Sequence, residues 1–191
     1  MAGAWDLKLF YAINGWPDWL NPLMQFMSKG SDSWPVRIIL FGILVYLVRR
    51  PETRVGGIVA GLGWIVANAI TDLIKDGWPY PRPGNVIEDA IIRVGMSQSA
   101  GTASAHSANM AFVAVAFVLW FGWRWSAWIP VALLVGLSRV YVAAHYPSQV
   151  LLGWLVGGLT AAALSLGIQW ELRRRGYQLV NGKVLRQIDT A

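Results

Sequence analysis

Three short groups of polar residues interrupt an otherwise apolar sequence, and their residue types suit the binding and transfer of a phosphate group. In chain order the candidates are Lys75 and Arg82; Ser104, Ala105 and His106; and Arg139, His145 and Gln149. These groups contain both histidines of the chain, which has no cysteine. Thiol catalysis, disulfide bonds and cysteine-bound zinc are therefore excluded, and the chemistry must come from imidazole, hydroxyl, amide and cationic groups.

Lys75, Arg82 and Arg139 together supply three positive charges, which match a phosphate dianion or a pyrophosphate. Arginine offers phosphate a two-pronged donor, and lysine offers a point charge. The proline-rich stretch from Pro79 to Pro83 stiffens the loop that presents Arg82. A single interfacial cation usually extends to the membrane surface without chemical function. We therefore base the prediction on three cations that accompany both histidines.

Ser104 stands at the N-cap position of the apolar run that follows it. A helix that begins there would leave the amides of Ala105 and His106 without partners inside the helix. Such amides, at the positive end of a helix dipole, form a ready binding site for an anion. Ser104 alone would be interpreted as a structural cap, but its position beside His106 predicts a phosphate-binding helix start.

His145 precedes Tyr146 and Pro147, and a proline at the first helical position predicts a helix that begins there and leaves Tyr146 outside. Gln149 then occupies the third helical position, from which a side chain can reach back to the helix start. Gln149 could accept a hydrogen bond from one imidazole nitrogen of His145 and direct the other toward phosphorus. Two histidines without a set of metal ligands suggest one nucleophile and one general acid.

The elements that must position these groups are membrane helices. Of 191 residues, 55% are hydrophobic and 14% charged, with a mean hydropathy of +0.45, whereas soluble domains carry about a quarter charged residues. A helix needs roughly 20 apolar residues to cross a bilayer. Apolar runs cover 55–74, 102–123, 125–144 and 147–170, with a shorter run at 35–48. We predict an all-α, polytopic transmembrane helix bundle of five to six spans.

The N-terminal stretch 5–27 mixes apolar with charged residues and is broken by Pro17 and Pro22. This pattern predicts an interfacial amphipathic helix followed by a turn. We treat the chain as a single membrane domain with three parts. These are the interfacial helix and turn (1–30), the helix bundle that carries the three groups (31–170) and a polar cytoplasmic tail (171–191).

The distribution of Lys and Arg predicts the orientation, because cytoplasmic loops carry an excess of them. We assign to the cytoplasmic side the loops that contain Arg49, Arg50, Arg54, Arg124, Arg173, Arg174, Arg175, Lys183 and Arg186. The three chemical groups then fall together on the opposite side. The net charge of +6 is spread over many small clusters and forms no single patch, so we predict no nucleic-acid partner.

The three groups, in this order and at this spacing, resemble the type 2 phosphatidic acid phosphatase family, whose lipid phosphatases share an active site with vanadium haloperoxidases. The family pattern is Lys-x6-Arg-Pro, then Pro-Ser-Gly-His, then Ser-Arg-x5-His-x3-Asp. The chain matches the first element with Lys75, Arg82 and Pro83, and it has Ala-Ser-Ala-His at 103–106 and Ser-Arg-x5-His-x3-Gln at 138–149. The helical layout extends the similarity to most of the chain.

The resemblance implies a role for each residue. His145 would attack phosphorus and form a phosphohistidine, and His106 would protonate the leaving oxygen and then activate water. The phosphoryl oxygens would be held by Lys75, Arg82, Ser104, the backbone at Ala105, and Arg139. No metal or other cofactor is implied. The substrate would be a lipid phosphate or pyrophosphate, as in the bacterial phosphatases of undecaprenyl pyrophosphate, phosphatidylglycerol phosphate, phosphatidic acid and lipid A.

Two positions depart from the family pattern. Ala105 replaces a glycine, and Gln149 replaces an aspartate that orients the nucleophile. Loss of the corresponding carboxylate in a serine protease triad costs about 10⁴ in rate. The alternatives to an active enzyme are therefore a catalytically impaired binder of lipid phosphates and a phosphotransferase that passes the phosphoryl group to another lipid.

The main hypothesis is a multi-pass lipid phosphatase or pyrophosphatase of the plasma (inner) membrane, surrounded by membrane lipids. Its active site would lie on the periplasmic or extracellular face, and its C-terminus would be cytoplasmic. The sequence leaves the oligomeric state open.

Overall fold

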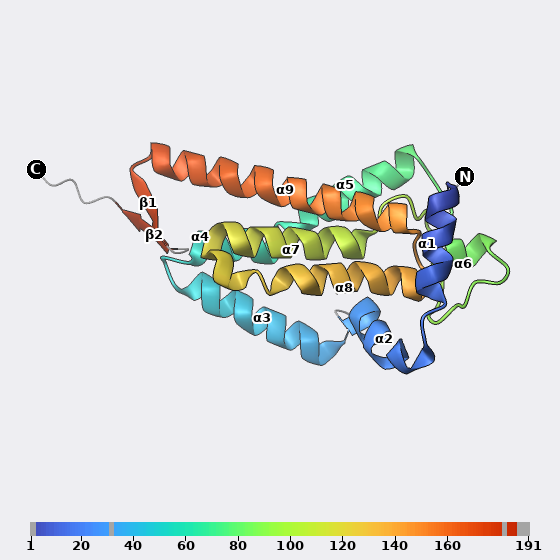
Figure 1. Cartoon of the computed structure of the whole chain (residues 1–191). Coiled ribbons are helices and arrows are strands. Elements are labelled where there is room, and N and C mark those ends of the chain that lie inside the picture. The colour runs from blue at the N-terminus through green and yellow to red at the C-terminus, as the bar shows by residue number, and fades with distance from the viewer. Residues whose placement is uncertain (1–2, 31–32, 181–182, 187–191) are drawn as a thin grey trace, which may run out of the picture.

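The computed structural model describes residues 3–30, 33–180 and 183–186, and most of them are helical (Figure 1). The α-helices are α1 (Ala4–Asn14), α2 (Asn21–Lys29), α3 (Trp34–Arg49), α4 (Arg54–Leu62), α5 (Trp64–Gly77), α6 (Pro83–Val86), α7 (Ala105–Phe121), α8 (Trp128–Tyr141) and α9 (Pro147–Arg174). Two short 3₁₀ helices, η1 (Asp18–Leu20) and η3 (Trp123–Trp125), precede α2 and α8. Strands β1 (Tyr177–Val180) and β2 (Lys183–Arg186) follow α9.

Helices α7 and α9 lie side by side and run in the same direction (Figure 1). Small, buried residues recur at every fourth position of α9, at Gly153, Gly157, Ala161 and Ser165. A Cβ atom on Gly153 would lie 2.5 Å from the carbonyl oxygen of Ser104, and one on Gly157 would lie 1.9 Å from that of Ala108. The two backbones therefore touch, as small residues allow between membrane helices.

Helix α8 returns antiparallel to α7, so the turn from α8 into α9 lies at the same end of the bundle as the start of α7 (Figure 1). Helices α4 and α5 follow one another past α7 and break at Gly63. A Cβ atom on Gly63 would lie 2.3 Å from the ring of Phe112, which is fully buried. Glycine at the break therefore lets the α4–α5 segment pass over an aromatic residue of α7.

Helix α1 lies across this same end of the bundle, roughly perpendicular to α7, α8 and α9 (Figure 1). Phe10 and Ile13 on one face are buried with Tyr141 and Tyr146, whereas Trp5 on another face is exposed. An interfacial amphipathic helix followed by a turn was predicted for residues 1–30, whereas the structure has two helices in this stretch, α1, which ends before Gly15, and α2. The location of α1 in the membrane interface stays a prediction.

The prediction of an all-α fold is wrong at the C-terminus. Strands β1 and β2 pair antiparallel, with Tyr177 opposite Arg186. Leu179 and Val184 pack against the apolar cluster at that end of the bundle, and the amide of Val184 donates to the carbonyl oxygen of Glu52 at 2.7 Å. The predicted tail 171–191 therefore begins inside α9 and continues as a hairpin, because alternating apolar residues find a buried surface there. Residues 187–191 lie outside the described residues.

Helix length and apolar composition identify candidate membrane spans. Within the described residues, two helical segments are long and apolar enough to cross a membrane, Arg54–Gly77 and Pro147–Arg174. The bent pair Asp18–Lys29 and Trp34–Arg49 would make a third span if it crosses as one unit. The structure thus has apolar helices suited to a membrane, and five to six spans stay a prediction.

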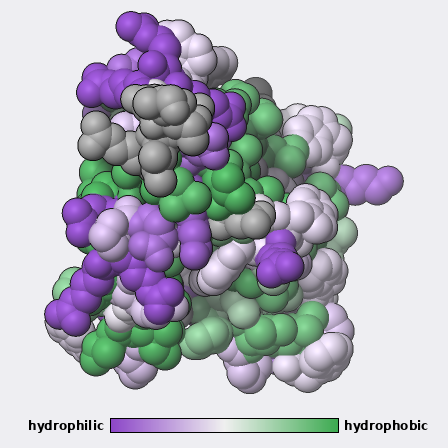
Figure 2. Space-filling view, turned by 90° about the vertical axis from the view of Figure 1, so that its left-hand side faces the viewer, coloured by the Kyte–Doolittle hydropathy of each residue, from purple (hydrophilic) through white to green (hydrophobic). Residues whose placement is uncertain are grey.

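Basic residues gather at the end of the bundle opposite α1. Figure 2 views this end, where hydrophilic residues gather mainly on the upper and left-hand parts and apolar residues lie between and below them. Its exposed basic side chains include Arg50 after α3, Arg54 at the start of α4, Arg124 in η3, and Arg173 to Arg175 at the end of α9. The orientation of the bundle in a membrane stays a prediction.

The contact between α7 and α9 predicts the effect of enlarging a single glycine. Gly157→Ala places a methyl group against the carbonyl oxygen of Ala108 and should lower the free energy of unfolding by about 1–3 kcal/mol. The matched control is Gly167→Ala in the same helix, because nothing lies within 4 Å of a Cβ atom there. The thermal unfolding midpoint in detergent should fall for Gly157→Ala and not for Gly167→Ala, and equal midpoints would contradict the contact.

Candidate active site

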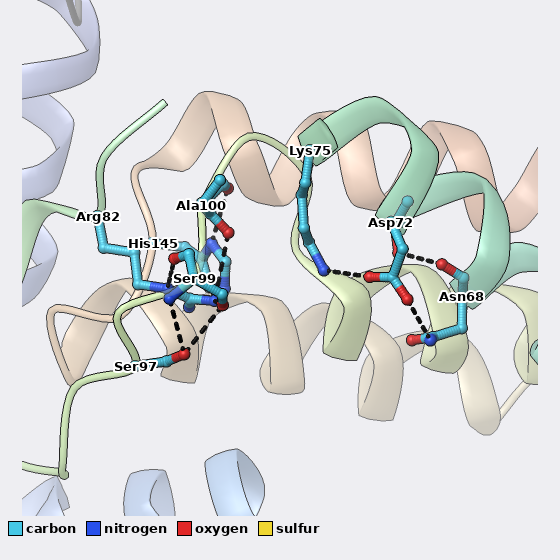
Figure 3. Close-up of polar contacts among 10 residues, drawn as sticks. Asn68, Asp72, Lys75, Arg82, Ser97, Ser99, Ala100 and His145 are labelled. Atoms are coloured by element: carbon cyan, nitrogen blue, oxygen red, sulfur yellow. Dashed lines mark hydrogen bonds and ion pairs between the residues drawn. The ribbon is translucent and has the colours of Figure 1, made fainter. Parts of the chain in front are cut away.

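The imidazole of His145 occupies the turn between α8 and α9 and is 2% exposed. Its Nδ1 lies 3.1 Å from the carbonyl oxygen of Gly101 and 3.1 Å from Oε1 of Gln149. Its Nε2 lies 2.9 Å from Nη1 of Arg82 (Figure 3). Residues from three parts of the chain therefore surround one ring.

These contacts decide which ring nitrogen carries the proton. Oε1 of Gln149 also accepts from the amide of Tyr146 at 3.1 Å, while its Nε2 donates to the carbonyl oxygen of Pro81 at 3.1 Å. The amide orientation of Gln149 is thus set by one backbone donor and one backbone acceptor. Nδ1 of His145 consequently faces two acceptors and must carry hydrogen, whereas arginine can only donate. The lone pair of Nε2 therefore points toward Arg82.

The surroundings of His145 also keep the ring neutral. Burial lowers the pKa of His145 well below its usual value, and the positive charges of Arg82 and Arg139 lower it further. The hydrogen bonds to Gln149 and Gly101 offset this only in part. A neutral imidazole with a free lone pair is the form in which histidine acts as a nucleophile or base.

Arg82 is fixed beside His145 by backbone and hydroxyl oxygens. Its Nε donates to the carbonyl oxygen of Ser99 at 2.9 Å, its Nη2 to the hydroxyl of Ser99 at 3.0 Å, and its Nη1 to the carbonyl oxygen of Ala144 at 3.3 Å. Burial lowers the pKa of Arg82. Arg82 caps the short helix α6 from extended backbone, at the end of the proline-rich loop that was predicted to present it.

The start of α7 lies against the start of α9. Ser104 is the N-cap of α7, as predicted, and its hydroxyl accepts from the amide of Ser107 at 3.4 Å and from the hydroxyl of Ser107 at 2.9 Å. The amide of Ser104 donates to the carbonyl oxygen of Gln149 at 3.0 Å. Ala105 and His106 are the first two residues of α7, and His106 is partly exposed. The positive ends of two helix dipoles therefore meet at His145.

The remaining two predicted cations differ in their placement. Arg139, in the last turn of α8, is 9% exposed and donates to the carbonyl oxygen of Ser28 at 3.1 Å and to the hydroxyl of Ser28. Lys75 instead pairs with Asp72 at 2.8 Å, one turn earlier in α5. Figure 3 shows the Lys75–Asp72 pair apart from the contacts between Arg82 and His145. The structure therefore pairs Lys75 with a carboxylate and does not join it to the contact between Arg82 and His145.

Some residues that shape the site were not predicted from the sequence. Gly101 accepts from His145 through its backbone, and a Cβ atom on Gly101 would lie 2.9 Å from Oε1 of Gln149 and 3.0 Å from Cγ of Arg82. Ser28 and Ser99 each hold one of the two arginines through a carbonyl oxygen as well as through a hydroxyl. Every residue carries a carbonyl oxygen, so these contacts have no signature in residue type or spacing. Within the described ranges, no three His, Asp or Glu side chains lie together as metal ligands would.

Comparison with known proteins gives a consistent result. A family model described as the PAP2 superfamily matches residues 56–173. An undecaprenyl-diphosphatase of Sulfolobus acidocaldarius is 31% identical over 139 residues, which are 72% of this chain and 66% of that protein, so the chain spans just under two thirds of its length. A decaprenylphosphoryl-5-phosphoribose phosphatase of Mycobacterium tuberculosis is 31% identical over 146 residues, covering 74% of this chain and 79% of that protein.

The fold has counterparts among solved structures. The crystal structure of Aquifex aeolicus LpxE matches 86% of this chain and 96% of its own with a TM-score of 0.70 at 24% identity. A transmembrane PAP2 type phosphatidylglycerolphosphate phosphatase from Bacillus subtilis matches 90% of each chain with a TM-score of 0.68 at 22% identity. At these identities the likeness concerns the fold.

The contacts of His145 predict its ring state in solution. In protein labelled with ¹⁵N-histidine, with the two ring systems assigned through His106→Asn, His145 should stay neutral and Nδ1-protonated between about pH 7.5 and pH 5.5, a range in which an exposed histidine gains a proton near pH 6.5. The folded state disfavours the charged ring, whereas the unfolded chain gains a proton on this histidine near pH 6.5. The free energy of unfolding should therefore be unaffected by His145 above about pH 6.5 and should decrease as the pH falls below it. A protonated Nε2, or a titration of His145 at or above pH 6.5, would contradict the site geometry.

Proposed function

The chain belongs to the PAP2 superfamily, and from this premise we propose that it is an integral membrane lipid phosphatase that acts through a phosphohistidine at His145. The observation that carries the proposal is the direction of the Nε2 lone pair of His145. Two acceptors hold the proton on Nδ1, so the nucleophilic nitrogen faces the side where Arg82 lies. Related proteins that carry the names of an undecaprenyl-diphosphatase and a decaprenylphosphoryl-5-phosphoribose phosphatase support a lipid phosphate as substrate.

In the first step, Nε2 of His145 attacks phosphorus, a P–N bond forms, and the P–O bond to the lipid breaks. His106 donates a proton to the leaving oxygen. In the second step, His106 takes a proton from water, the water oxygen attacks phosphorus, and the P–N bond breaks to release phosphate and neutral His145. Neither step of this proposal requires a metal ion or a redox partner. His106 acts as the acid in the first step and as the base in the second.

The phosphoryl oxygens carry spread charge in the transition state, so preplaced donors contribute most of the rate enhancement. In this proposal Arg82 and Arg139 bind two of these oxygens, and the start of α7 at Ser104 and Ala105 supplies a hydroxyl and an amide. Nη1 of Arg82 already lies 2.9 Å from the attacking nitrogen. A phosphoryl oxygen takes over this donor as phosphorus approaches. Lys75 moves from Asp72 to the phosphate.

Gln149 performs the orienting role without a charge. Its Oε1 accepts from Nδ1 of His145, as the family aspartate would, and its Nε2 adds a contact to the carbonyl oxygen of Pro81. An aspartate has no donor for Pro81 and would raise the pKa of His145. These contacts support an active enzyme over an impaired binder of lipid phosphates.

The orientation is proposed from the two ends of the bundle. The site lies at the end that α1 covers, and the exposed arginines between α3 and α4, in η3 and at the end of α9 lie at the other end (Figures 1 and 2). An excess of basic residues favours the cytoplasmic side. The protein would therefore be a multi-pass protein of the plasma (inner) membrane with its site on the periplasmic or extracellular face.

The proposal is tested by phosphate release from undecaprenyl diphosphate, phosphatidic acid and phosphatidylglycerol phosphate in mixed micelles. The unaltered protein should hydrolyse at least one of them, and His145→Ala should reduce kcat by more than about 10³-fold because the nucleophile is lost. Gln149→Asp should not increase kcat, since the shorter side chain loses the contact to Pro81.

Equal release by the unaltered protein and His145→Ala would overturn the mechanism. Negligible turnover that Gln149→Asp restores would establish the impaired binder instead. Label that appears in a second lipid, and not as free phosphate, would establish a phosphotransferase.

A further inference from the structure

One face of α1 carries three buried residues at four-residue spacing, Asp6, Phe10 and Asn14. Residues at this spacing line up along one side of a helix. Asp6 and Asn14 are each 2% exposed, and Phe10 is fully buried. The family match begins at residue 56, so this helix lies outside the part of the chain that the family model describes.

The three residues contact the beginning, middle and end of the segment from Tyr141 to Ser148, which carries His145. Nδ2 of Asn14 donates to the carbonyl oxygen of Tyr141 at 2.8 Å. The ring of Phe10 packs against that of Tyr146, with centroids 5.8 Å apart.

At the end of the segment, the carboxylate of Asp6 accepts from Ser148 twice, from its amide at 2.9 Å and from its hydroxyl at 2.6 Å. A buried carboxylate is costly unless it is hydrogen-bonded, and a helix N-terminus is where a negative charge is favoured. Asp6 meets both conditions at the first turn of α9, one residue before Gln149. Its position therefore specifies a contact between α1 and α9 that an apolar residue could not make.

The segment held in this way is strained. Ala143 has a φ of +63°, a left-handed conformation that costs a residue with a side chain roughly 1–2 kcal/mol. Such conformations persist only where neighbouring structure enforces them. The amide of Gly84 donates to the carbonyl oxygen of Ala143 at 3.0 Å, and α1 fastens the segment on both sides of the strained residue.

Helix α1 is itself fastened by the loop that follows α6. Asn14 exchanges two hydrogen bonds with the backbone of Ile91, each of 2.9 Å. The guanidinium of Arg93 lies over the ring of Tyr141 at 4.0 Å and donates to the carbonyl oxygens of Asn14 and Tyr141 at 2.8 and 2.9 Å. The contact of α1 with the segment is therefore part of a connected set of buried and partly buried hydrogen bonds.

We propose that α1 is part of the catalytic apparatus, and that Asp6 and Asn14 are positioning residues for His145. They hold both ends of the Tyr141–Ser148 segment, so that Nδ1 of His145 stays on Gly101 and Gln149 while the lone pair of Nε2 stays directed toward Arg82 and the phosphate that Arg82 would bind. The kinetic consequence rests on the proposed phosphatase function, whereas the effect on the ring of His145 does not.

The test replaces Asp6 in two ways. Asp6→Ala removes the two carboxylate oxygens that accept from Ser148. Because alanine is a strong helix former, α1 itself should stay helical. The variant should lower kcat about 10- to 100-fold through misplacement of the nucleophile. KM should stay within about threefold, because the residues proposed to hold phosphate bind it without α1. Asp6→Asn should recover most of the activity, since an amide can accept from the Ser148 amide and donate to the Ser148 hydroxyl. The matched control is Lys8→Ala, which removes an exposed charged side chain from the same helix.

The ring signals of His145 provide a readout that does not depend on turnover. In ¹⁵N-histidine-labelled Asp6→Ala, the single Nδ1-protonated form should give way to a mixture with the Nε2-protonated form, while the His106 signals keep their positions. Ser148→Ala, which removes one of the two contacts, should show the same change to a smaller extent and serves if Asp6→Ala does not fold.

Unchanged His145 signals in Asp6→Ala, or in Ser148→Ala should Asp6→Ala not fold, would overturn the proposal. An equal loss of kcat in Lys8→Ala would also overturn it. If the unaltered protein releases no phosphate from any lipid, the proposed function fails, and the ring signals still decide whether α1 positions His145.

Discussion

The direct backbone contact between α7 and α9 is the constraint on which the rest of the site depends. Gly153 and Gly157 bring α9 against the carbonyl oxygens of Ser104 and Ala108, and because the helices run in the same direction, both begin at the same end of the bundle. An antiparallel pair at equal distance would place one start at each end. The parallel pair instead directs two positive helix ends at one point, and the carbonyl oxygen of Gln149 in α9 accepts the amide of Ser104 in α7.

At this end of the bundle, His145 is kept neutral and oriented by hydrogen-bond acceptors at Nδ1 and by a cationic donor at Nε2. Carbonyl and amide oxygens on Nδ1 determine the tautomer, and the guanidinium of Arg82 on Nε2 disfavours protonation. A carboxylate at position 149 would hold the proton on Nδ1 more strongly, but its negative charge would favour protonation of Nε2. Glutamine provides the acceptor alone and uses its donor on Pro81. The neutral residue therefore suits a site in which two arginines already lower the pKa of His145.

The sequence predicted the parts of this site that depend on residue type and spacing. Ser104 at the N-cap of α7 and Pro147 at the first position of α9 follow from local rules and are confirmed. Three features were not predicted: the pairing of Lys75 with Asp72, the contacts of α1 with the Tyr141–Ser148 segment, and the C-terminal hairpin. Each of these features depends on tertiary contacts between segments or on a choice among several possible partners. The carbonyl oxygens that accept from Arg82 and Arg139 are likewise present in every residue, so residue type does not identify them. Packing decides which of them are used.

The central claim is that His145 receives the phosphoryl group. The most direct measurement is rapid-quench trapping with lipid phosphate labelled in its terminal phosphoryl group, followed by mapping of the labelled peptide. The account predicts label on the peptide that contains His145, rising and decaying within a single turnover while free phosphate appears. Hydrolysis of the lipid with no label on either histidine, or with label on His106, would contradict it.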